Sequence, residues 1–374
     1  MAREFKKIKI LFTIPNFDTA GSGKALLKIA KQLDSTVFEP HILCMHNRGA
    51  FFKVVEASGI PVHIFQYTTV MKPYTKGVLN CFKIAKMFRS IAPDIIHSFH
   101  YSADYSEPLA AKIAGIKWLY TKKNMNWGGS SKNSWNLRTW LADHIIYQNT
   151  DMKTMFFPKT NNTSLISRGV DVSEFFPFET NATLLDKYAL SKEDRIIITV
   201  ANLVPLKGID VLIKAFHTAD LAAKQWKLLI VGDKNNAHGI ELQELVTSLK
   251  IEKQVVFSGK VLNVNEHLNL AELFVLPTLF KGEGSPVALL EAMATGLCVL
   301  GSDLPGIKDQ LIHTPEHLVT AGNVEMWAEV LRKFCQHDKE GLKAMGNNFL
   351  KHIKASYTLN KEVEQTENVY LKIV

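Results

Sequence analysis

The chain has 374 residues, of which 47% are hydrophobic and 21% are charged, and its formal net charge at pH 7 is +8. This composition is typical of a globular protein, and the length favours two domains of roughly 100–200 residues each. The sequence contains no run of about 18 apolar residues, which argues against a membrane-spanning chain.

The four cysteines, Cys44, Cys81, Cys298 and Cys335, lie far apart in apolar segments and form no CxxC pair. Their spacing favours buried free thiols in a reducing compartment, so we expect a cytoplasmic protein. The positive charge is uneven, because residues 1–177 carry 23 Lys or Arg and 12 Asp or Glu, whereas residues 178–374 carry 21 and 24. A basic first half predicts an anionic partner.

Three anionic partners fit this charge: a phosphorylated substrate, an acidic lipid surface and nucleic acid. The segment 74–90, "YTKGVLNCFKIAKMFRS", has the pattern of a cationic amphipathic helix, so we expect peripheral contact with an anionic inner membrane face. No nucleic-acid partner is expected, because the basic residues are scattered and no nucleic-acid-binding motif is present.

Short β-branched apolar runs alternate with helix-period segments through both halves, which is the pattern of βαβ units around a parallel sheet. In the first half we expect strands at 7–14, 41–46, 62–67, 94–99, 117–121 and 144–149, with helices at 23–33 and 77–90. In the second half we expect strands at 195–202, 226–233, 254–259, 273–278 and 297–303, with helices at 207–219, 240–250 and 285–295. The predicted domains are residues 1–177 and 178–357, followed by a helix at 358–374 that could cross back to the first domain.

The loop between the strand at 273–278 and the next helix has the residues of an anion site. Pro286 suits the first helical position and Ser285 the N-cap, while Gly284 permits close backbone approach to a phosphate. Glu291 lies about one and a half turns into the helix, within reach of a diol beside that phosphate, and Glu283 projects from the loop. A phosphate, a diol and a further hydroxylated group describe a nucleotide sugar, although two solvated surface glutamates remain the alternative.

The segment 283–303, "EGSPVALLEAMATGLCVLGSD", resembles the E-x7-E signature of GT-B glycosyltransferases, in particular retaining family 4, and the resemblance covers nearly the whole chain. It implies an α/β fold of GT-B architecture, in which two Rossmann-like doubly wound domains face each other across a cleft. The first domain would bind the acceptor and the second the nucleotide-sugar donor. The resemblance implies that Glu283 contacts the donor sugar and that Glu291 holds the ribose hydroxyls. The helix N-terminus from Ser285 to Val287 would carry diphosphate charge.

The segment 201–216, "ANLVPLKGIDVLIKAF", resembles the family's G-R-L-x-x-x-K-G segment. Lys207 falls on the family lysine that pairs with the donor diphosphate, but Asn202 stands where the family usually has arginine. Since an amide cannot replace a cation, either Lys281, Lys123 or Arg168 compensates or the donor site is weakened.

The segment 16–33 resembles the family's glycine-rich loop, which approaches the donor, and Gly21 and Gly23 are its expected working residues. A Walker A loop would require glycine at Asp18 and Ser or Thr at Ala25, so its spacing is not met. A helix-capping glycine turn remains the alternative.

Where many family members carry a histidine near the reacting sugar, this chain has lysines and polar residues at 121–124. The candidate acceptor contacts are His97, His100, Lys122, Lys123, Trp127 and Arg168. The lysines suit an acidic acceptor or the diphosphate, and Trp127 beside two glycines suits sugar stacking. The histidines have a structural role as their alternative, because they lie at a strand end.

The sequence has no DxD, HExxH or clustered Cys/His motif, so we expect no essential metal and no cofactor besides the nucleotide-sugar co-substrate. We predict a retaining glycosyltransferase that moves a hexosyl unit from a UDP- or GDP-sugar to a hydroxyl of a glycan or lipid-linked acceptor. Polysaccharide, glycolipid or cell-envelope glycan synthesis is the expected setting, with Lys207 and Glu283 as the catalytic residues. Two alternatives stay open: other nucleotide-sugar chemistry such as epimerisation, and a catalytically weak binding protein.

Overall fold

The computed structural model describes residues 6–18, 20–100, 102–126, 131–221, 225–280 and 283–374. The chain divides into two compact units. Unit 1 comprises residues 1–167 and 359–374, and unit 2 comprises residues 168–358. The division therefore falls after residue 167, whereas the sequence placed the boundary at 177.

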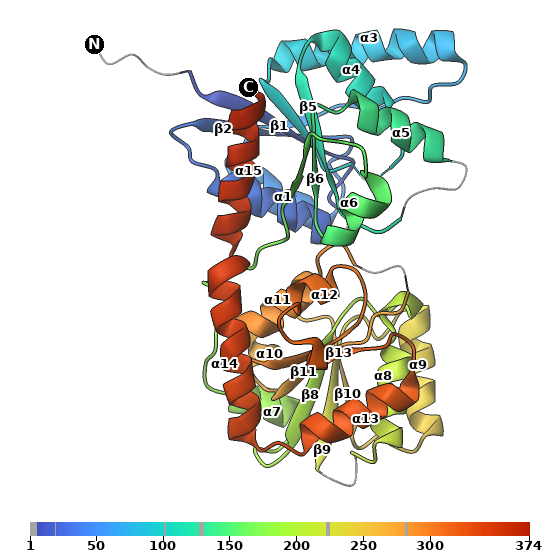
Figure 1. Ribbon diagram of the computed structural model, residues 1–374, viewed down its shortest axis with the longest axis vertical. Helices are drawn as coiled ribbons and strands as arrows, with labels where there is room; N and C mark the ends of the chain where they lie inside the picture. Colours follow the sequence, from blue (N-terminus) through green and yellow to red (C-terminus); the bar gives the residue numbers. More distant parts are fainter. Residues whose placement is uncertain (1–5, 19, 101, 127–130, 222–224, 281–282) are drawn as a thin grey trace. The chain divides into compact units, whose positions relative to one another are not determined.

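Unit 1 is a seven-stranded parallel sheet with helices on both faces (Figure 1). Its elements are β1 (Ile8–Ile14), α1 (Ala20–Gln32), β2 (Phe38–Cys44), α2 (Ala50–Glu56), β3 (Val62–Ile64), α3 (Tyr74–Ile91), β4 (Ile95–Ser98), α4 (Ser106–Ala114), β5 (Lys117–Lys122), α5 (Lys132–Leu141), β6 (His144–Tyr147), α6 (Thr150–Phe156), β7 (Thr163–Leu165) and α15 (Leu359–Ile373). The strand order is β3-β2-β1-β4-β5-β6-β7.

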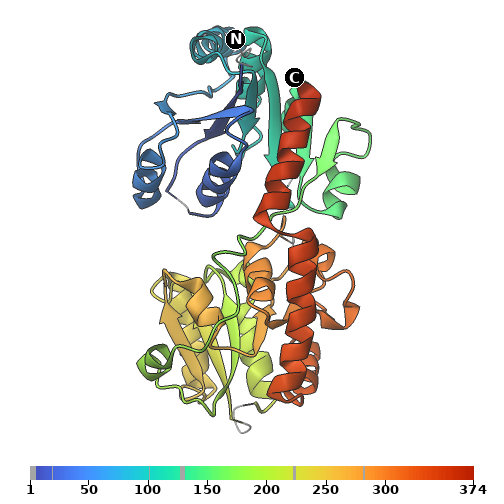
Figure 2. The same ribbon diagram turned by 90° about the vertical axis from the view of Figure 1, so that its left-hand side faces the viewer.

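The two faces of this sheet bury two separate cores, because successive side chains of a strand point to opposite faces. In β1, Ile10 and Phe12 join the core beneath α1 and α15, while Leu11 joins the core beneath α3 and α4. The C-terminal helix α15 contacts α1 (Figure 2) and buries Tyr370 in the first of these cores. The last residues of the chain therefore complete the fold of its first domain.

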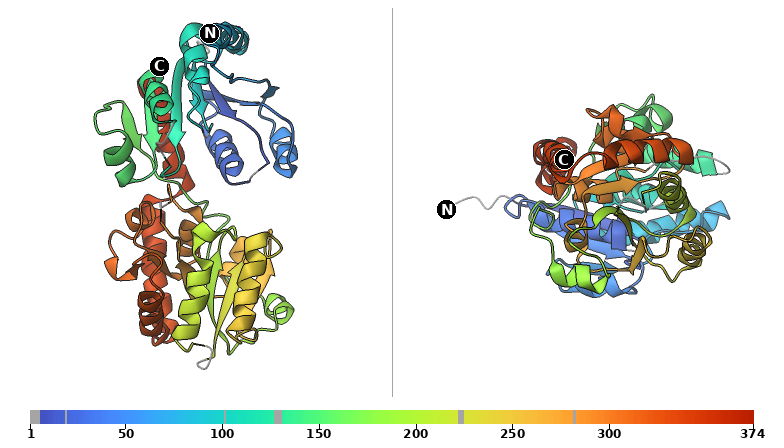
Figure 3. Two further views of the ribbon diagram at one scale, coloured as in Figure 1. Left: turned by 90° about the vertical axis from the view of Figure 1, so that its right-hand side faces the viewer. Right: turned by 90° about the horizontal axis from the view of Figure 1, so that it is seen from below.

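Unit 2 has a six-stranded parallel sheet in the order β10-β9-β8-β11-β12-β13. Its elements are α7 (Ala182–Lys187), β8 (Arg195–Val200), η2 (Pro205–Lys207), α8 (Ile209–Thr218), β9 (Trp226–Val231), α9 (Ala237–Ser248), β10 (Val255–Gly259), α10 (Val264–Leu268), β11 (Leu273–Leu276), α11 (Val287–Ala294), β12 (Cys298–Ser302), α12 (Ile307–Gln310), η4 (Pro315–His317), β13 (Leu318–Val319), α13 (Val324–Cys335) and α14 (Lys339–Ser356). Residues of α8, α9 and α13 pack on one face, and residues of α7, α11 and α14 pack on the other (Figure 3).

The predicted fold class is confirmed: both units are doubly wound α/β domains, and every strand expected from the sequence is present. The sequence missed β7 and β13, two edge strands that are too short for a clear pattern of apolar residues. In each sheet the strand order reverses beside the first strand, between β1 and β4 and between β8 and β11. Ligands of open α/β sheets bind at such switch points, beyond the carboxyl ends of the strands.

Candidate active site

The loops that follow β8 and β11 meet at the switch point of unit 2. Gly208 ends the short helix η2 with φ at +65°, and a Cβ at this position would lie 2.1 Å from the carbonyl oxygen of Pro277. The backbone N–H of Leu279 donates to the carbonyl oxygen of Leu206 at 2.9 Å. Only glycine permits this approach, and the two loops are therefore held together.

Lys207 and Glu283 meet at this junction. The ammonium of Lys207 donates to Oε1 of Glu283, and the hydroxyl of Thr278 donates to the same oxygen at 3.1 Å. The two charged side chains are 22% and 19% exposed, so the pair is partly shielded from water but open to a ligand. The two residues that the sequence singled out as catalytic lie in contact with each other.

The Glu283 segment is also held by the loop that follows β12. The backbone N–H of Glu283 donates to the carbonyl oxygen of Pro305 at 3.2 Å. Gly306 has φ at +81°, and a Cβ there would lie 2.5 Å from the carbonyl oxygen of Glu283. Three strand ends of unit 2 therefore fix the position of this carboxylate.

Helix α11 begins at Val287, one residue later than the sequence predicted, with Pro286 at its N-cap. The predicted cap Ser285 has another role, because its hydroxyl accepts from the backbone N–H of Arg168 at 3.1 Å and from Nε2 of Gln310 at 3.0 Å. Pro286 has no side-chain oxygen that could accept from the first turn of α11. The N–H groups of that turn are therefore suited to bind an anion. Glu291 is partly buried one turn further, about 6 Å along the helix axis from Val287.

Two other donor-site candidates have contrasting positions. Asn202 is exposed in the loop after β8, and its carbonyl oxygen accepts from the N–H of Val204 at 2.9 Å. Arg168 is 9% exposed and is the first residue of unit 2, where its backbone binds Ser285. The sequence grouped Arg168 with the acceptor contacts of the first domain, and the structure instead places it beside the loop that precedes α11.

The candidate glycines of the first domain lie inside α1 instead of in a loop before it. A Cβ on Gly23 would lie 2.7 Å from Cδ1 of Phe17, so Gly23 allows this ring to pack on the helix. A Cβ on Gly21 would meet nothing within 4 Å, which leaves the surface of this turn open. The candidate stacking residue Trp127 lies outside the described residues.

His97 is a core residue of unit 1. Its side chain is 1% exposed, with Nδ1 bonded to the Tyr370 hydroxyl at 2.6 Å and Nε2 to the Thr121 hydroxyl at 2.8 Å. Burial lowers the pKa of His97 well below its usual value, so the ring is neutral. Both ring nitrogens are engaged, and the structural alternative therefore replaces the predicted acceptor contact.

The two candidate lysines at the end of β5 also form contacts within the protein. Lys122 is 2% exposed, and its Nζ donates to the Asn124 carbonyl oxygen at 2.6 Å and to the Asn126 carbonyl oxygen at 2.7 Å. Burial lowers the pKa of Lys122 to about 7. Lys123 donates to the carbonyl oxygen of Phe99 at 2.9 Å and lies over the Phe99 ring. Both lysines thus shape the loops after β4 and β5.

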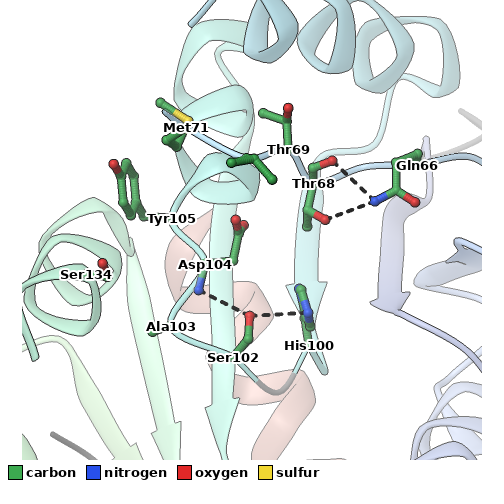
Figure 4. A pocket seen from close by; sticks show the side chains of 11 residues that line it. Gln66, Thr68, Thr69, Met71, His100, Ser102, Ala103, Asp104, Tyr105 and Ser134 are labelled. Atoms are coloured by element: carbon green, nitrogen blue, oxygen red, sulfur yellow. Dashed lines mark hydrogen bonds between the residues drawn. The ribbon is translucent and has the colours of Figure 1, made fainter. Parts of the chain in front are cut away.

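Unit 1 has a pocket of about 630 Å³ formed by the loops after β3 and β4 and by the start of α5 (Figure 4). Most of its lining residues are polar, and they include Thr68, His100, Asp104 and Ser134. None of the lining residues is a lysine or arginine, so the pocket suits a neutral hydroxylated ligand. Of the lining residues, the sequence pointed only to His100, because the others belong to loops or to the start of α5, where no motif is present.

His100 enters this pocket as a neutral ring. Burial, assisted by the charges of Arg138 and Lys123, lowers its pKa to about 3. Its Nε2 is bonded to the hydroxyl of Ser102 at 3.2 Å (Figure 4). Asp104 accepts from the N–H of Ser106 at 3.1 Å, and thereby holds the start of α4. The pocket wall is therefore ordered before a ligand arrives.

A buried ion pair lies beside this wall. Glu107 and Arg138 have fully buried side chains, and Nη2 of Arg138 lies 3.6 Å from Oε2 of Glu107. The hydroxyls of Thr13 and Ser98 donate to the Glu107 carboxylate at 2.5 and 2.8 Å. The ion pair and its hydrogen bonds link β1, β4, α4 and α5.

The described residues contain no group of three or more His, Cys, Asp or Glu side chains that could hold a metal ion. In the same part of the chain, no helix is both long and apolar enough to span a bilayer.

Comparison with known proteins gives matches over both units. Residues 181–352 match the family described as glycosyl transferases group 1, and residues 19–174 match glycosyltransferase family 4. The chain is 29% identical over 205 residues to N-acetyl-alpha-D-glucosaminyl L-malate synthase of Bacillus anthracis, in a match that spans 54% of this chain and 52% of that protein. The match therefore covers about half the length of this relative.

Two further relatives match over most of their length. The chain is 22% identical to the Escherichia coli UDP-Gal:alpha-D-GlcNAc-diphosphoundecaprenol alpha-1,3-galactosyltransferase, over 80% of each chain. The crystal structure of Anabaena HepE in complex with UDP and glucose superposes with a TM-score of 0.79 at 19% identity, covering 98% of this chain and 100% of that one. With its two doubly wound units, the chain belongs to the GT-B glycosyltransferases of the group 1 and family 4 type, and it is a transferase of carbohydrate biosynthesis.

Proposed function

We propose that the protein transfers a hexosyl unit from a UDP- or GDP-sugar to an acceptor hydroxyl with retention of the anomeric configuration. The observation that carries this proposal is the contact between Lys207 and Glu283 beside the start of α11, at the switch point of unit 2. A cation and a helix N-terminus suit a diphosphate, and a carboxylate suits sugar hydroxyls. The named substrate of the Escherichia coli relative and the ligands of HepE have this chemistry.

In the proposed reaction, the bond between the anomeric carbon and the diphosphate oxygen breaks. The acceptor oxygen bonds to the same face of that carbon, and its proton passes to the departing diphosphate. Charge builds up on the diphosphate, so the protein accelerates the step by positioning the reactants and stabilising this charge. Lys207 and the first-turn N–H groups of α11 supply the stabilisation.

We assign to Arg168 the stabilisation of the diphosphate, because Asn202 stands where the family usually has an arginine for this role. It lies in unit 2, and its backbone is fixed by the Ser285 hydroxyl immediately before α11. A guanidinium from this position would bind the diphosphate with two parallel hydrogen bonds. Glu291 would bind the ribose hydroxyls, and Glu283 the hexose.

The acceptor would bind in unit 1. The pocket beside His100 has polar walls without a cation, which favours a neutral sugar hydroxyl over an acidic group. We propose a glycan or lipid-linked glycan as the acceptor, and peripheral contact of the protein with an anionic membrane. We propose no essential metal, because the diphosphate charge is met by Lys207, Arg168 and α11. Activity should then survive treatment with a chelator.

Release of nucleoside diphosphate from a panel of UDP- and GDP-sugars, with sugar and lipid-linked acceptors, tests the function. Wild type should release diphosphate from one donor, and Glu291→Ala should lower this rate at least about tenfold at subsaturating donor. Glu329→Ala, which changes an exposed glutamate of α13, is the matched control and should leave the rate unchanged. An inverted anomeric centre in the product, or product formed without acceptor, would contradict the proposal.

The absence of an arginine at position 202 favours a second candidate, a nucleotide-sugar-binding protein with weak catalysis. The two candidates differ in what Arg168→Ala and Asn202→Arg do to turnover at saturating donor. If Arg168 compensates, Arg168→Ala should lower turnover strongly, and Asn202→Arg in that background should restore part of it. If wild type binds donor without turnover and Asn202→Arg alone creates activity, the second candidate is correct.

A further inference from the structure

Helix α3 has an outer face that is apolar to an extent unusual for an exposed helix. Tyr74, Val78 and Phe82 follow one another at intervals of four residues, and Leu79 lies beside them. Their exposed fractions are 58%, 39%, 53% and 63%, and Val70 in the preceding loop is 80% exposed. These five side chains, which we call the α3 stripe, expose apolar surface to water on and beside one side of α3.

The buried face of α3 packs against the rest of unit 1. Gly77, Cys81, Ile84, Ala85 and Phe88 are buried, and α3 packs on α4 (Figure 1). The stripe is therefore not needed for the core of unit 1. Since the inner face fixes α3 in place, the stripe is also a rigid surface.

The charged residues that α3 and the segments next to it in the sequence contribute are all of one sign. Residues 57–93 contain no Asp or Glu, whereas they contain Lys72, Lys76, Lys83, Lys86 and Arg89. All five cations are exposed, and none of them takes part in an ion pair that the structure describes. An apolar face flanked by these cations complements an anionic lipid surface, where apolar side chains enter the acyl boundary and lysines remain among the headgroups. Asp104, which lines the pocket together with Val70, lies outside α3.

We infer that the α3 stripe and its lysines dock unit 1 onto an anionic lipid bilayer. The loop that carries Val70 connects this surface to the polar pocket, because Val70 and Met71 also line that pocket. Asn80 of α3 donates to the Thr69 hydroxyl at 3.1 Å, which holds the loop against the helix. Docking would thus bring the pocket to the level of the headgroups, where the sugar of a lipid-linked acceptor lies.

Vesicle co-sedimentation of the full chain tests this inference directly. The protein should sediment with vesicles of phosphatidylglycerol and phosphatidylcholine but remain in the supernatant with phosphatidylcholine alone. Added salt should weaken the binding, because lysines near a charged surface act within a Debye length. Equal recovery in the supernatant with both vesicle types would overturn the inference.

Two double variants separate the apolar and the ionic contributions. Lys76→Ser with Lys83→Ser should lower the partition coefficient about 25-fold, at about fivefold per lysine. Leu79→Ser with Phe82→Ser should lower it at least about tenfold, since both side chains would leave water on docking. All four residues are exposed, so each variant should retain the thermal unfolding midpoint of wild type.

Matched controls come from unit 2. Lys343→Ser with Lys351→Ser removes two exposed lysines of α14, and Leu262→Ser with Ile240→Ser removes two exposed apolar side chains. Both controls should bind vesicles as wild type does. If they lose binding to the same extent as the α3 variants, general charge or hydrophobicity explains the binding, and the inference is wrong. If the stripe variants change only the oligomeric state, the surface joins two copies of the chain instead.

Discussion

Lys207 and Glu283, which are 76 positions apart in the sequence, form an ion pair at the carboxyl ends of β8 and β11. Neither residue is deeply buried, so the pair is suited to exchange its internal contact for contacts with a ligand. A diphosphate would compete with Glu283 for the lysine, and the released carboxylate would face the hexose. In the proposed function, the pair would thus couple recognition of the diphosphate with recognition of the hexose.

Removal of the Lys207 cation should slow turnover about 100- to 1,000-fold, which is the usual loss for one group that stabilises developing charge. Lys207→Ala should show this loss in kcat when nucleoside diphosphate release is measured at saturating donor. Lys214→Ala, in the exposed i,i+4 ion pair with Asp210 on α8, is the control and should retain wild-type turnover. A loss confined to KM would show that Lys207 only binds donor.

Substitution of Gly208 should destabilise unit 2 and displace Lys207. Gly208→Ala would place a Cβ 2.1 Å from the Pro277 carbonyl oxygen at a φ of +65°, so the loops must separate. We expect a loss above about 1 kcal/mol in unfolding free energy, together with lower activity. Gly259→Ala is the control, because its φ of +79° has a similar cost but its Cβ would meet only Cε of Lys234 at 4.0 Å. Equal destabilisation by both changes would contradict the steric argument.

The loss of one member of the buried pair of Glu107 and Arg138 should lower the free energy of unfolding strongly. Arg138→Leu would leave the Glu107 carboxylate unpaired in the core, and we expect a loss of about 3–5 kcal/mol in denaturant unfolding. The double change with Glu107→Leu should recover much of this loss, because it removes the unpaired charge. A double variant that is less stable than Arg138→Leu would show that the unpaired Glu107 carboxylate does not cause the loss.

The buried His100 ring should make the stability of unit 1 depend on acidity. Its pKa is about 3 in the folded protein and near 6.5 when unfolded, so between these values the unfolded chain binds a proton that the folded chain does not. The contribution of the neutral His100 ring to the free energy of unfolding is therefore fully present above about pH 6.5, and it is lost as the pH decreases toward 3. His100→Gln should reduce the slope of the urea midpoint against pH between 4 and 6.5. His46→Gln, at an exposed position, should leave the slope unchanged.

The order of strands and helices was predictable because burial on both sides of a parallel sheet leaves continuous apolar runs such as those of β8 and β11. The donor-site residues were also predictable, since Lys207, Glu283 and Glu291 lie at fixed intervals within short segments at strand ends. Their roles remain predictions, and the structure shows only where they lie. The edge strands β7 and β13 were not predicted, because, unlike the three-residue strand β3, they do not belong to a longer apolar run in the sequence.

By itself, the sequence determined two doubly wound α/β domains, because apolar periodicity is a local property of the chain. The resemblance of its motifs to those of GT-B glycosyltransferases indicated the loops that carry the donor-site candidates. Only the tertiary structure decided that His97 is a core residue bonded to Tyr370, and that Arg168 binds the Ser285 loop. It alone revealed the polar pocket and the buried pair of Glu107 and Arg138, and it showed which side chains of the predicted helix at 74–90 are exposed. These features depend on which distant segments pack together, and that information is contained in the three-dimensional arrangement instead of in the spacing along the chain.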